Sequence, residues 1–299
     1  MGGNLVNLAQ INTAVASATL ADHPSIMRSG KMDLRIARTS EEIRASQALR
    51  YQIFYEELGA TPPNDDAVKN RIDCDEYDNI CDHLLVIDHG PDNRPHVVGS
   101  YRLLRQVVAS QHKGFYSSRE YDLSPLFDKA VTTILGEGRQ LLELGRSCIA
   151  PPYRNARTIT MLWRGIASYL QMHSIGFVFG CASFPGTDPE AIKDQLSYLY
   201  HNHLASEDIR VRAHQKQYIP MNMLPDGSFD VRAAWLKLPP LIKGYLRVGG
   251  YVGDGAYIDH KFNTTDVFIL LPVDKMIGKY TERFSEPQSN NDNRNNIVA

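Results

Sequence analysis

The sequence lacks the features typical of disulfide-rich, membrane-spanning and nucleic-acid-binding proteins. Its 299 residues contain four cysteines and no CxxC pair, which favours a reduced cytoplasm. No apolar run approaches the roughly 18 to 20 residues that span a bilayer, and the N-terminus does not have the basic and apolar regions of a signal peptide. The formal charge of −2 argues against nucleic acid as a partner, because phosphate-reading domains carry a strong basic excess. We expect a cytoplasmic protein, either free or peripheral at the inner face of the membrane.

The composition is sufficient for a large core. Hydrophobic residues make up 43% of the chain, and no change in composition requires a second domain. The first 31 residues show no sustained hydrophobic period, and the end of the chain is rich in asparagine. We expect one domain over residues 32–285, between a flexible extension at 1–31 and a disordered polar tail at 286–299.

Helix and strand patterns follow one another from Thr39 onward. Thr39 and Glu42 have the spacing of a capping box, which predicts a helix over about 40–58. Asp188 followed by Pro189 predicts the start of a later helix. The remaining patterns predict strands at 83–88, 96–105, 141–149, 176–184 and 266–273, and helices at 157–173 and 187–203. This order indicates an α/β fold with a mixed sheet covered by helices.

The stretch LLELGRSC, residues 141–148, sets two charged side chains in an apolar strand. A regular strand alternates faces, so Glu143 and Arg146 would point in opposite directions. A β-bulge centred on Gly145 adds one residue, turns both side chains toward the same cleft and leaves backbone N–H groups free to bind an oxyanion. The alternative is an ordinary buried ion pair within a larger network.

Further charged residues come earlier in the chain. Arg50 and Phe54 stand four apart on the first predicted helix and share a face, where Arg50 is suited to holding a carboxylate. Arg102 lies inside the apolar strand VVGSYRLLR. The stretch RIDCDEYDN adds a cluster of acids, Asp73, Asp75, Glu76 and Asp78. Such a cluster either binds a cationic substrate or keeps a loop solvated.

Seven of these residues resemble, in their order and spacing, the signature of acyl-homoserine-lactone synthases and their relatives in the GNAT acyltransferase superfamily. They are Arg50, Phe54, Asp75, Asp78, Arg102, Glu143 and Arg146. The longer stretches LELGRSCIAPPYR, LWRGIASYL, FGCASFPGTDPE and PPLIKGYLRVGGYVGDGAYID resemble the hemolysin-like GNAT branch, most closely the family of L-ornithine Nα-acyltransferases. That similarity extends over roughly residues 33 to 285. It implies a GNAT-like mixed sheet with a bulged central strand, flanked by helices.

The resemblance also implies a reaction. A fatty acyl group, 3-hydroxylated in that family, would pass from the phosphopantetheine thioester of acyl carrier protein to the α-amine of L-ornithine, giving lyso-ornithine lipid. No tightly bound cofactor is expected, and the lipid product makes peripheral membrane contact plausible. An α-amine with a pKa near 8 is mostly protonated at neutral pH, so a base is needed. We assign that role to Glu143, with Arg146 orienting it and the backbone at Gly145 binding the oxyanion.

The acceptor site follows from the same reasoning. Asp75 and Asp78 are expected to hold the δ-ammonium group of ornithine, and Arg50 or Arg102 its carboxylate. Phe54 and Ser183 complete the predicted substrate pocket. By analogy with the lactone synthases, the alternative is that these residues mainly shape the pocket.

The sequence departs from the coenzyme A-dependent GNAT pattern after the bulged strand. Those enzymes carry a glycine-rich pyrophosphate loop, whereas residues 154–159 here contain no glycine. Acyl carrier protein presents only a phosphodiester, and residues 139–164 hold five arginines against Glu143 alone, which suits an acidic carrier. The residues predicted to bind the carrier are Arg154, Arg157, Thr158 and Arg164. The alternative is an ordinary helix start with solvated arginines.

Three other patterns are set aside. His83 and Asp88 match an H-x4-D acyltransferase motif, but within one strand they point to opposite faces. His201 and His203 diverge on a helix and have no further ligands, so no metal is predicted. Cys148 has no evident histidine partner, which disfavours a covalent acyl-enzyme.

Three rival functions remain open from the sequence. One is a lactone-type synthase that uses S-adenosylmethionine as acceptor. Another is an N-acyl amino acid synthase for lysine or glutamine, and the third is a non-catalytic lipid-associated protein.

Overall fold

The computed structural model describes residues 25–90, 95–128, 136 and 138–276. The polar tail expected at 286–299 and most of the N-terminal extension expected at 1–31 therefore lie outside the described residues. The last part of that extension is described, and it contains the first strand, Met27–Ser29. Within the described segments, no helix combines the length and the apolar character needed to cross a bilayer.

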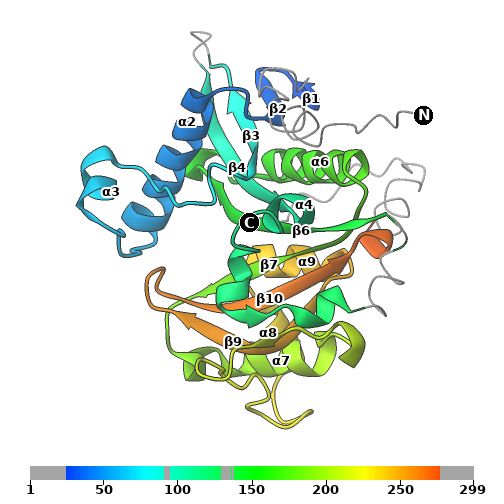
Figure 1. The fold of residues 1–299 in the computed structure, drawn as a ribbon. Helices are drawn as coiled ribbons and strands as arrows, with labels where there is room; N and C mark the ends of the chain where they lie inside the picture. Colours follow the sequence, from blue (N-terminus) through cyan, green and yellow to red (C-terminus); the bar gives the residue numbers. More distant parts are fainter. Residues whose placement is uncertain (1–24, 91–94, 129–135, 137, 277–299) are drawn as a thin grey trace, which may run out of the picture.

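A ten-stranded sheet runs through the molecule in the order β1-β2-β3-β4-β6-β7-β10-β9-β8-β5 (Figure 1). Neighbouring strands are antiparallel except for the pairs β6–β7 and β8–β9, which are parallel. The strands are β1 (Met27–Ser29), β2 (Met32–Ile36), β3 (Asp82–Asp88), β4 (His96–Arg105), β5 (Tyr121–Asp122), β6 (Gln140–Ile149), β7 (Ile175–Pro185), β8 (Arg212–Ala213), β9 (Tyr251–Asp259) and β10 (Thr264–Pro272). The mixed sheet predicted from the sequence is confirmed.

Helices cover both faces of this sheet. The α-helices are α2 (Ser40–Tyr51), α3 (Asp65–Asn70), α4 (Gln106–Ala109), α6 (Ala156–Met172), α7 (Lys193–His203), α8 (Val231–Lys237) and α9 (Pro240–Arg247). A π-helical segment, η2 (Gln52–Glu57), continues α2. The 3₁₀ turns are η3 (Tyr116–Arg119), η4 (Ser124–Phe127), η5 (Pro151–Tyr153), η6 (Pro189–Ile192) and η7 (Glu207–Ile209).

Alternation along β10 shows how the two faces differ. Val267, Ile269 and Leu271 belong to the main core, together with buried residues of α6, α7, α8 and α9. Phe268 and Leu270 point to the other face, where they pack in a second core with residues of β6, β7 and the segment that contains η3. Because successive side chains of a strand point to opposite faces, one apolar strand can serve both cores. The second face carries the candidate site.

The predicted elements are largely confirmed, with some differences at their ends. The Thr39 side chain accepts a hydrogen bond from the backbone N–H of Glu42, as expected of an N-cap. The Glu42 carboxylate, however, accepts from the N–H of Arg38 rather than from that of Thr39. Asp188 caps the short turn η6, from which α7 continues. The sequence patterns do not predict the strands β1, β2, β5, β8 and β9 or the helices α3, α4, α8 and α9.

Strands β6 and β7 are joined by α6 as a parallel crossover, and their pairing is short. The register runs from Gln140 opposite Ile175 to Glu143 opposite Phe179. Beyond that point β6 continues to pair with β4, whereas β7 continues to pair with β10. The two strands thus separate on the C-terminal side of Glu143, and their separated ends border the candidate site.

Gly180 lies where this pairing ends, and we expect its replacement to be costly. A Cβ atom at Gly180 would lie 2.3 Å from the carbonyl oxygen of Leu144, a backbone atom that cannot move aside on its own. Gly180→Ala should therefore lower the free energy of unfolding by about 1 to 3 kcal/mol, measured by urea denaturation. Gly244→Ala, in α9, is the matched control because its Cβ meets no atom within 4 Å. The control should be neutral or stabilising by up to about 1 kcal/mol; a similar loss in both variants would contradict the steric account.

Candidate functional site

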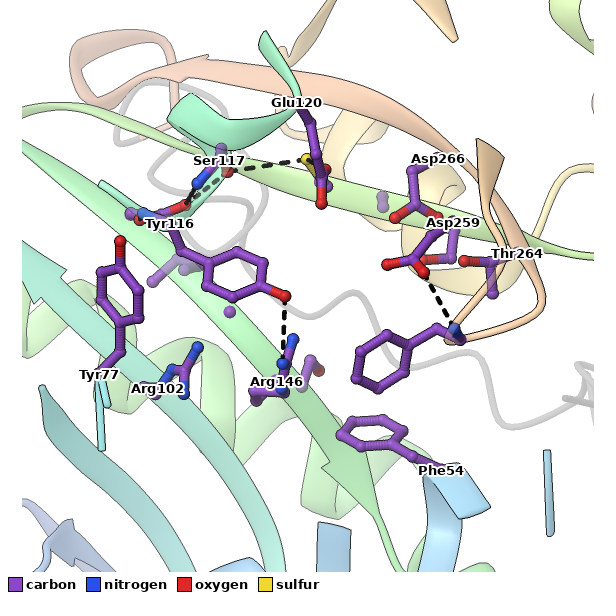
Figure 2. A pocket seen from close by; sticks show the side chains of 18 of the residues that line it. Phe54, Tyr77, Arg102, Tyr116, Ser117, Glu120, Arg146, Asp259, Thr264 and Asp266 are labelled. Carbon is purple, nitrogen blue, oxygen red and sulfur yellow. Dashed lines mark hydrogen bonds between the residues drawn. The ribbon is translucent and has the colours of Figure 1, made fainter. Parts of the chain in front are cut away.

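A pocket of about 240 Å³ opens on the second face, beside the separated ends of β6 and β7 (Figure 2). Residues 144–147 of β6 and 181–183 of β7 form two of its sides. Figure 2 shows arginines on one side of the pocket and carboxylates on another. The predicted site residues that line it are Phe54, Arg102, Glu143, Gly145, Arg146 and Ser183. The structure therefore brings six of them together.

The predicted bulge in β6 is confirmed. Ser100 pairs with Cys148 and Arg102 with Gly145, so Arg146 and Ser147 together face the single residue Tyr101. The residue in the left-handed conformation is Arg146, with φ of 50°, and not Gly145. A bulge leaves its extra residue unpaired in the ladder, and here that residue lies in the wall of the pocket.

Glu143 is buried and held by a turn. Its side chain accepts hydrogen bonds from the backbone N–H of Tyr116 at 2.7 Å, from that of Ser117 at 2.7 Å and from the Ser117 hydroxyl at 2.5 Å. Burial raises the pKa of Glu143, and the hydrogen bonds from Ser117 and Tyr116 oppose that rise. These bonds, rather than Arg146, orient the carboxylate, which corrects the expected role of Arg146.

Arg146 connects the pocket to an acidic loop. Its guanidinium lies 3.4 Å from a carboxylate oxygen of Asp73 and 3.3 Å from one of Asp75, and it donates to the Tyr116 hydroxyl. It also stacks at 4.9 Å from the ring centroid of Tyr116 and 4.6 Å from that of Phe262. Arg146 is therefore fixed in the wall of the pocket.

Arg50 and Asp78 lie behind the pocket and not in it. Arg50 has no exposed surface, and both oxygens of Asp78 receive its hydrogen bonds, at 2.7 and 2.8 Å. Asp73 accepts from the same guanidinium, while Arg102 donates to Asp75 at 2.6 Å. Arg50, Asp75 and Asp78, expected to bind the acceptor, therefore form ion pairs with neighbouring residues and do not line the pocket.

Three carboxylates that the sequence did not single out line the same pocket. Glu120 follows η3, Asp259 ends β9 and Asp266 lies in β10, and oxygen atoms of all three lie within 4.8 Å of one another. Burial, and then the charge of Asp266, raises the pKa of Glu120 to about 8. Burial raises the pKa of Asp266 to about 6. Because these residues come from segments far apart in the chain, no local pattern indicates their grouping.

The raised pKa of Glu120 predicts a pH-dependent stability. An unfolded glutamate has a pKa of about 4.3, so the unfolded chain releases this proton more readily as the pH rises from about 4 to 8. The free energy of unfolding should fall over that window, and Glu120→Gln should remove the part of the fall above about pH 6, because Asp266, with its pKa of about 6, contributes its own fall below that. Denaturation at pH 5 and pH 8 should show the variant stabilised relative to wild type at pH 8, on the order of a few kcal/mol, with little difference at pH 5. An equal difference at both pH values would contradict the shifted pKa.

The predicted carrier-binding residues lie outside the pocket, with Arg154, Arg157 and Thr158 at the start of α6 and Arg164 about two turns further along it. Arg154 forms two hydrogen bonds with Glu57, at 2.5 and 2.7 Å. Arg157 and Arg164 are exposed and contact neutral atoms of β1, namely the oxygens of Ser29 and the sulfur of Met27. Within the described residues, neither of these two arginines has a carboxylate partner.

Thr158 differs from the other three, because it is buried. Its backbone N–H donates to the side chain of Asn155, the N-cap of α6. Its side chain is therefore part of the helix start and does not face a docking partner.

The H-x4-D pattern and Cys148, which were set aside in the sequence, have structural roles. His83 and Asp88 lie at opposite ends of β3, where His83 contacts the carbonyl of Asp78 and Asp88 accepts from Tyr153. Cys148 is buried, and burial raises the pKa of its thiol to about 12, unsuited to a nucleophile.

The two helix histidines also have local partners. His201 contacts the carbonyl of Leu224, and His203 contacts the hydroxyl of Tyr198. Neither belongs to the group of described potential metal ligands that lie close together.

The chain matches a known domain family, and most of its sequence is similar to that of characterised enzymes. A model of the acetyltransferase (GNAT) domain matches residues 49–164, which confirms the GNAT-like fold. An L-ornithine N(alpha)-acyltransferase of Rhodobacter capsulatus is 45% identical over 255 residues, 85% of this chain and 94% of that protein. Its namesake in Brucella abortus is 44% identical over 256 residues, 85% and 88% of the two chains. Among solved structures, FeeM, an N-acyl amino acid synthase from uncultured soil microbes, aligns with a TM-score of 0.42 at 11% identity over 83% of this chain and 94% of that one.

Proposed function

The chain belongs to the L-ornithine Nα-acyltransferase family, and we propose that it transfers a fatty acyl group from acyl carrier protein to the α-amine of L-ornithine. The similarity of 41–45% identity over 85–93% of the chain carries the part of this proposal that concerns acyl transfer to ornithine. The pocket supports it, because arginine and carboxylate side chains occupy different sides of one small cavity. Such a distribution of charge suits an amino acid that carries both signs.

Glu143 remains our candidate for the base. The neutral α-amine attacks the carbonyl carbon of the thioester, the C–S bond breaks, and the products are an amide and the thiol of the carrier. The proton lost by nitrogen passes to Glu143, directly or through one water, and then to the leaving thiolate. Burial raises the pKa of Glu143 toward the working pH, which favours both proton transfers.

The bulge supplies the second part of the chemistry. The carbonyl oxygen gains negative charge as the amine attacks, and our candidate to bind it is a backbone N–H in the bulge at Arg146, a residue that lines the pocket. Arg102 lines the same wall and uses only Nη1 for its described contacts with Asp75 and Asp78. Its other nitrogens are our candidates to bind the carboxylate of the acceptor.

We place the carrier along the first half of α6. Arg157 and Arg164 present positive charge there without a described carboxylate partner, and this charge suits the surface of an acidic carrier.

The acyl chain of the product is strongly apolar, so we propose that the reaction takes place next to a membrane that can take up the lipid.

An acceptor panel tests the proposed reaction. Purified enzyme is mixed with 3-hydroxypalmitoyl acyl carrier protein and either ornithine, lysine, glutamine or S-adenosylmethionine, and the products are identified by mass spectrometry. We expect an amide with ornithine at a kcat/KM at least about tenfold above the others. Release of methylthioadenosine from S-adenosylmethionine, or no thioester loss with ornithine, would overturn the proposal.

A charge reversal tests the donor. The double variant Arg157→Glu, Arg164→Glu should raise KM for the acyl carrier protein by about tenfold or more, because like charges then face the acidic carrier. It should leave turnover of the small thioester acyl-pantetheine unchanged, since that donor does not dock on α6. Arg232→Glu, an exposed change on α8, is the matched control. Equal loss with both donors would show that the arginines do not act through the carrier.

A further inference from the structure

The carboxylates of Glu120, Asp259 and Asp266 form one end of the pocket. In Figure 2 they point toward one another, while Arg102 and Arg146 lie on another side. Within the described residues, none of the three forms an ion pair with an arginine, lysine or histidine. This distinguishes them from Asp73, Asp75 and Asp78, each of which is paired with arginine.

The hydrogen bonding of these carboxylates is incomplete. Oδ1 of Asp266 has no hydrogen-bond partner although only 7% of this residue is exposed. The hydroxyls of Ser183 and Thr264 lie close enough to Asp266 to oppose the rise of its pKa, but the Thr264 hydroxyl forms no hydrogen bond of normal geometry. Oδ1 of Asp259 accepts hydrogen bonds from the backbone N–H groups of Lys261 and Phe262, so Oδ2 is the oxygen that it offers to a ligand. A buried polar atom without a partner is costly, so a ligand that donates hydrogen bonds is expected here.

The chemistry of this end fits an ammonium group better than a metal ion. A primary ammonium has three N–H donors, and the three acidic side chains offer one oxygen each within 4.8 Å of one another. The charge of a bound ammonium lowers the pKa of Glu120 from its value of about 8 in the empty pocket, so Glu120 ionises as the ligand binds. Mg²⁺ and Ca²⁺ require six or more oxygen ligands. One neighbour of the group is the thiol of Cys181, 3.2 Å from Glu120, which is a poor ligand for such ions.

We propose that Glu120, Asp259 and Asp266 bind the side-chain ammonium group of the amino-acid acceptor. This inference rests on the proposed function and names the part of the site that selects a cationic side chain. With the ammonium at this end and the α-carboxylate toward Arg102, the α-amine lies between them, on the side of the pocket where Glu143 is held. Charge at the far end of the acceptor, rather than its length alone, then sets the specificity.

Ornithine and norvaline provide the test, because norvaline has the same carbon chain and no δ-amine. Calorimetry without any acyl donor measures the Kd of each for wild type, Asp266→Asn and Glu120→Gln. We expect ornithine to bind wild type more tightly than norvaline, and each variant to weaken ornithine by about 10- to 100-fold while norvaline changes less than about threefold. Asp254→Asn, a carboxylate on β9 that pairs with Arg212 and does not line the pocket, is the control and should change neither.

Three outcomes separate the possibilities. Equal weakening of ornithine and norvaline in the variants, or no weakening of either, would overturn the ammonium site. Thermal stabilisation of wild type by Mg²⁺, Ca²⁺ or Mn²⁺ that disappears in Asp266→Asn, with ornithine binding unaffected, would replace it with a metal site. If the binding pattern is as expected but the acceptor panel yields no amide, the proposed reaction fails and the ammonium site stands. Thermal unfolding of each variant checks that it is folded.

Discussion

Glu143→Gln should lower kcat for amide formation by a factor of about 10² to 10⁴ and leave KM for ornithine within about threefold. The amide keeps the size of the side chain, and its single oxygen can still accept from the N–H of Ser117, whereas its NH2 group then faces the N–H of Tyr116. It cannot take a proton from the acceptor amine. The measurement is steady-state thioester loss from acyl carrier protein, with the rise of kcat/KM on the acid side of the pH profile absent in the variant.

Ser117→Ala separates the base from its support. This change removes the hydroxyl bond to Glu143 but keeps the backbone N–H and the carboxylate. We expect a loss in kcat of about tenfold or less, with the acid side of the profile retained. Glu190→Gln, at an exposed position in η6, should have no effect. If Glu143→Gln raises KM and spares kcat, the residue binds the acceptor and is not the base.

Arg50→Ala should produce the largest loss of stability, about 3 to 5 kcal/mol in the free energy of unfolding at pH 7. Arg50 is fully buried and donates to the carboxylates of Asp73 and Asp78 and to the carbonyl of Asp73. Removing it leaves buried negative charge near a second carboxylate. Urea denaturation measures the change, and a loss below about 1 kcal/mol would show that the network is not a major source of stability.

The exposed pair Arg71–Glu56 is the control for this network. The side chain of Arg71 is 68% exposed, so Arg71→Ala should cost no more than about 1 kcal/mol. The pH dependence gives a second check. Burial disfavours charged Asp78, yet the hydrogen bonds and charge of Arg50 outweigh this and hold its pKa well below the usual range. Its contribution is therefore present above about pH 4 and lost as the pH falls, and Arg50→Ala should lose that acid-side decline.

The bulge could be predicted from eight residues, because the reason for it is local. Two charged side chains three apart in an apolar strand can face one cleft only if the alternation is interrupted. What the sequence could not supply is the partner of each charge. Glu143 is held by Tyr116 and Ser117, and Arg146 by Asp73 and Asp75, and these contacts depend on how distant segments fold together.

The partners of the acidic residues are even harder to predict from the sequence. Asp75 and Asp78 attract attention as part of a dense run, but their neighbours in space are Arg50 and Arg102, which neutralise them. Glu120, Asp259 and Asp266 are scattered in the sequence and meet only when β10, β9 and the segment after η3 come together. A dense run of acids in a sequence therefore says little about where charge remains unpaired in the fold.

The short pairing of β6 with β7 has a mechanical consequence. The arginine side of the pocket is carried by β4 and β6 and the carboxylate side by β9 and β10, and beyond Glu143 and Phe179 no ladder ties these two parts together. An acceptor that contacts both sides acts as a crosslink across the gap. Amide hydrogen exchange in residues 144–147 and 181–183 should slow when ornithine binds, and norvaline, which reaches one side only, should leave it nearly unchanged.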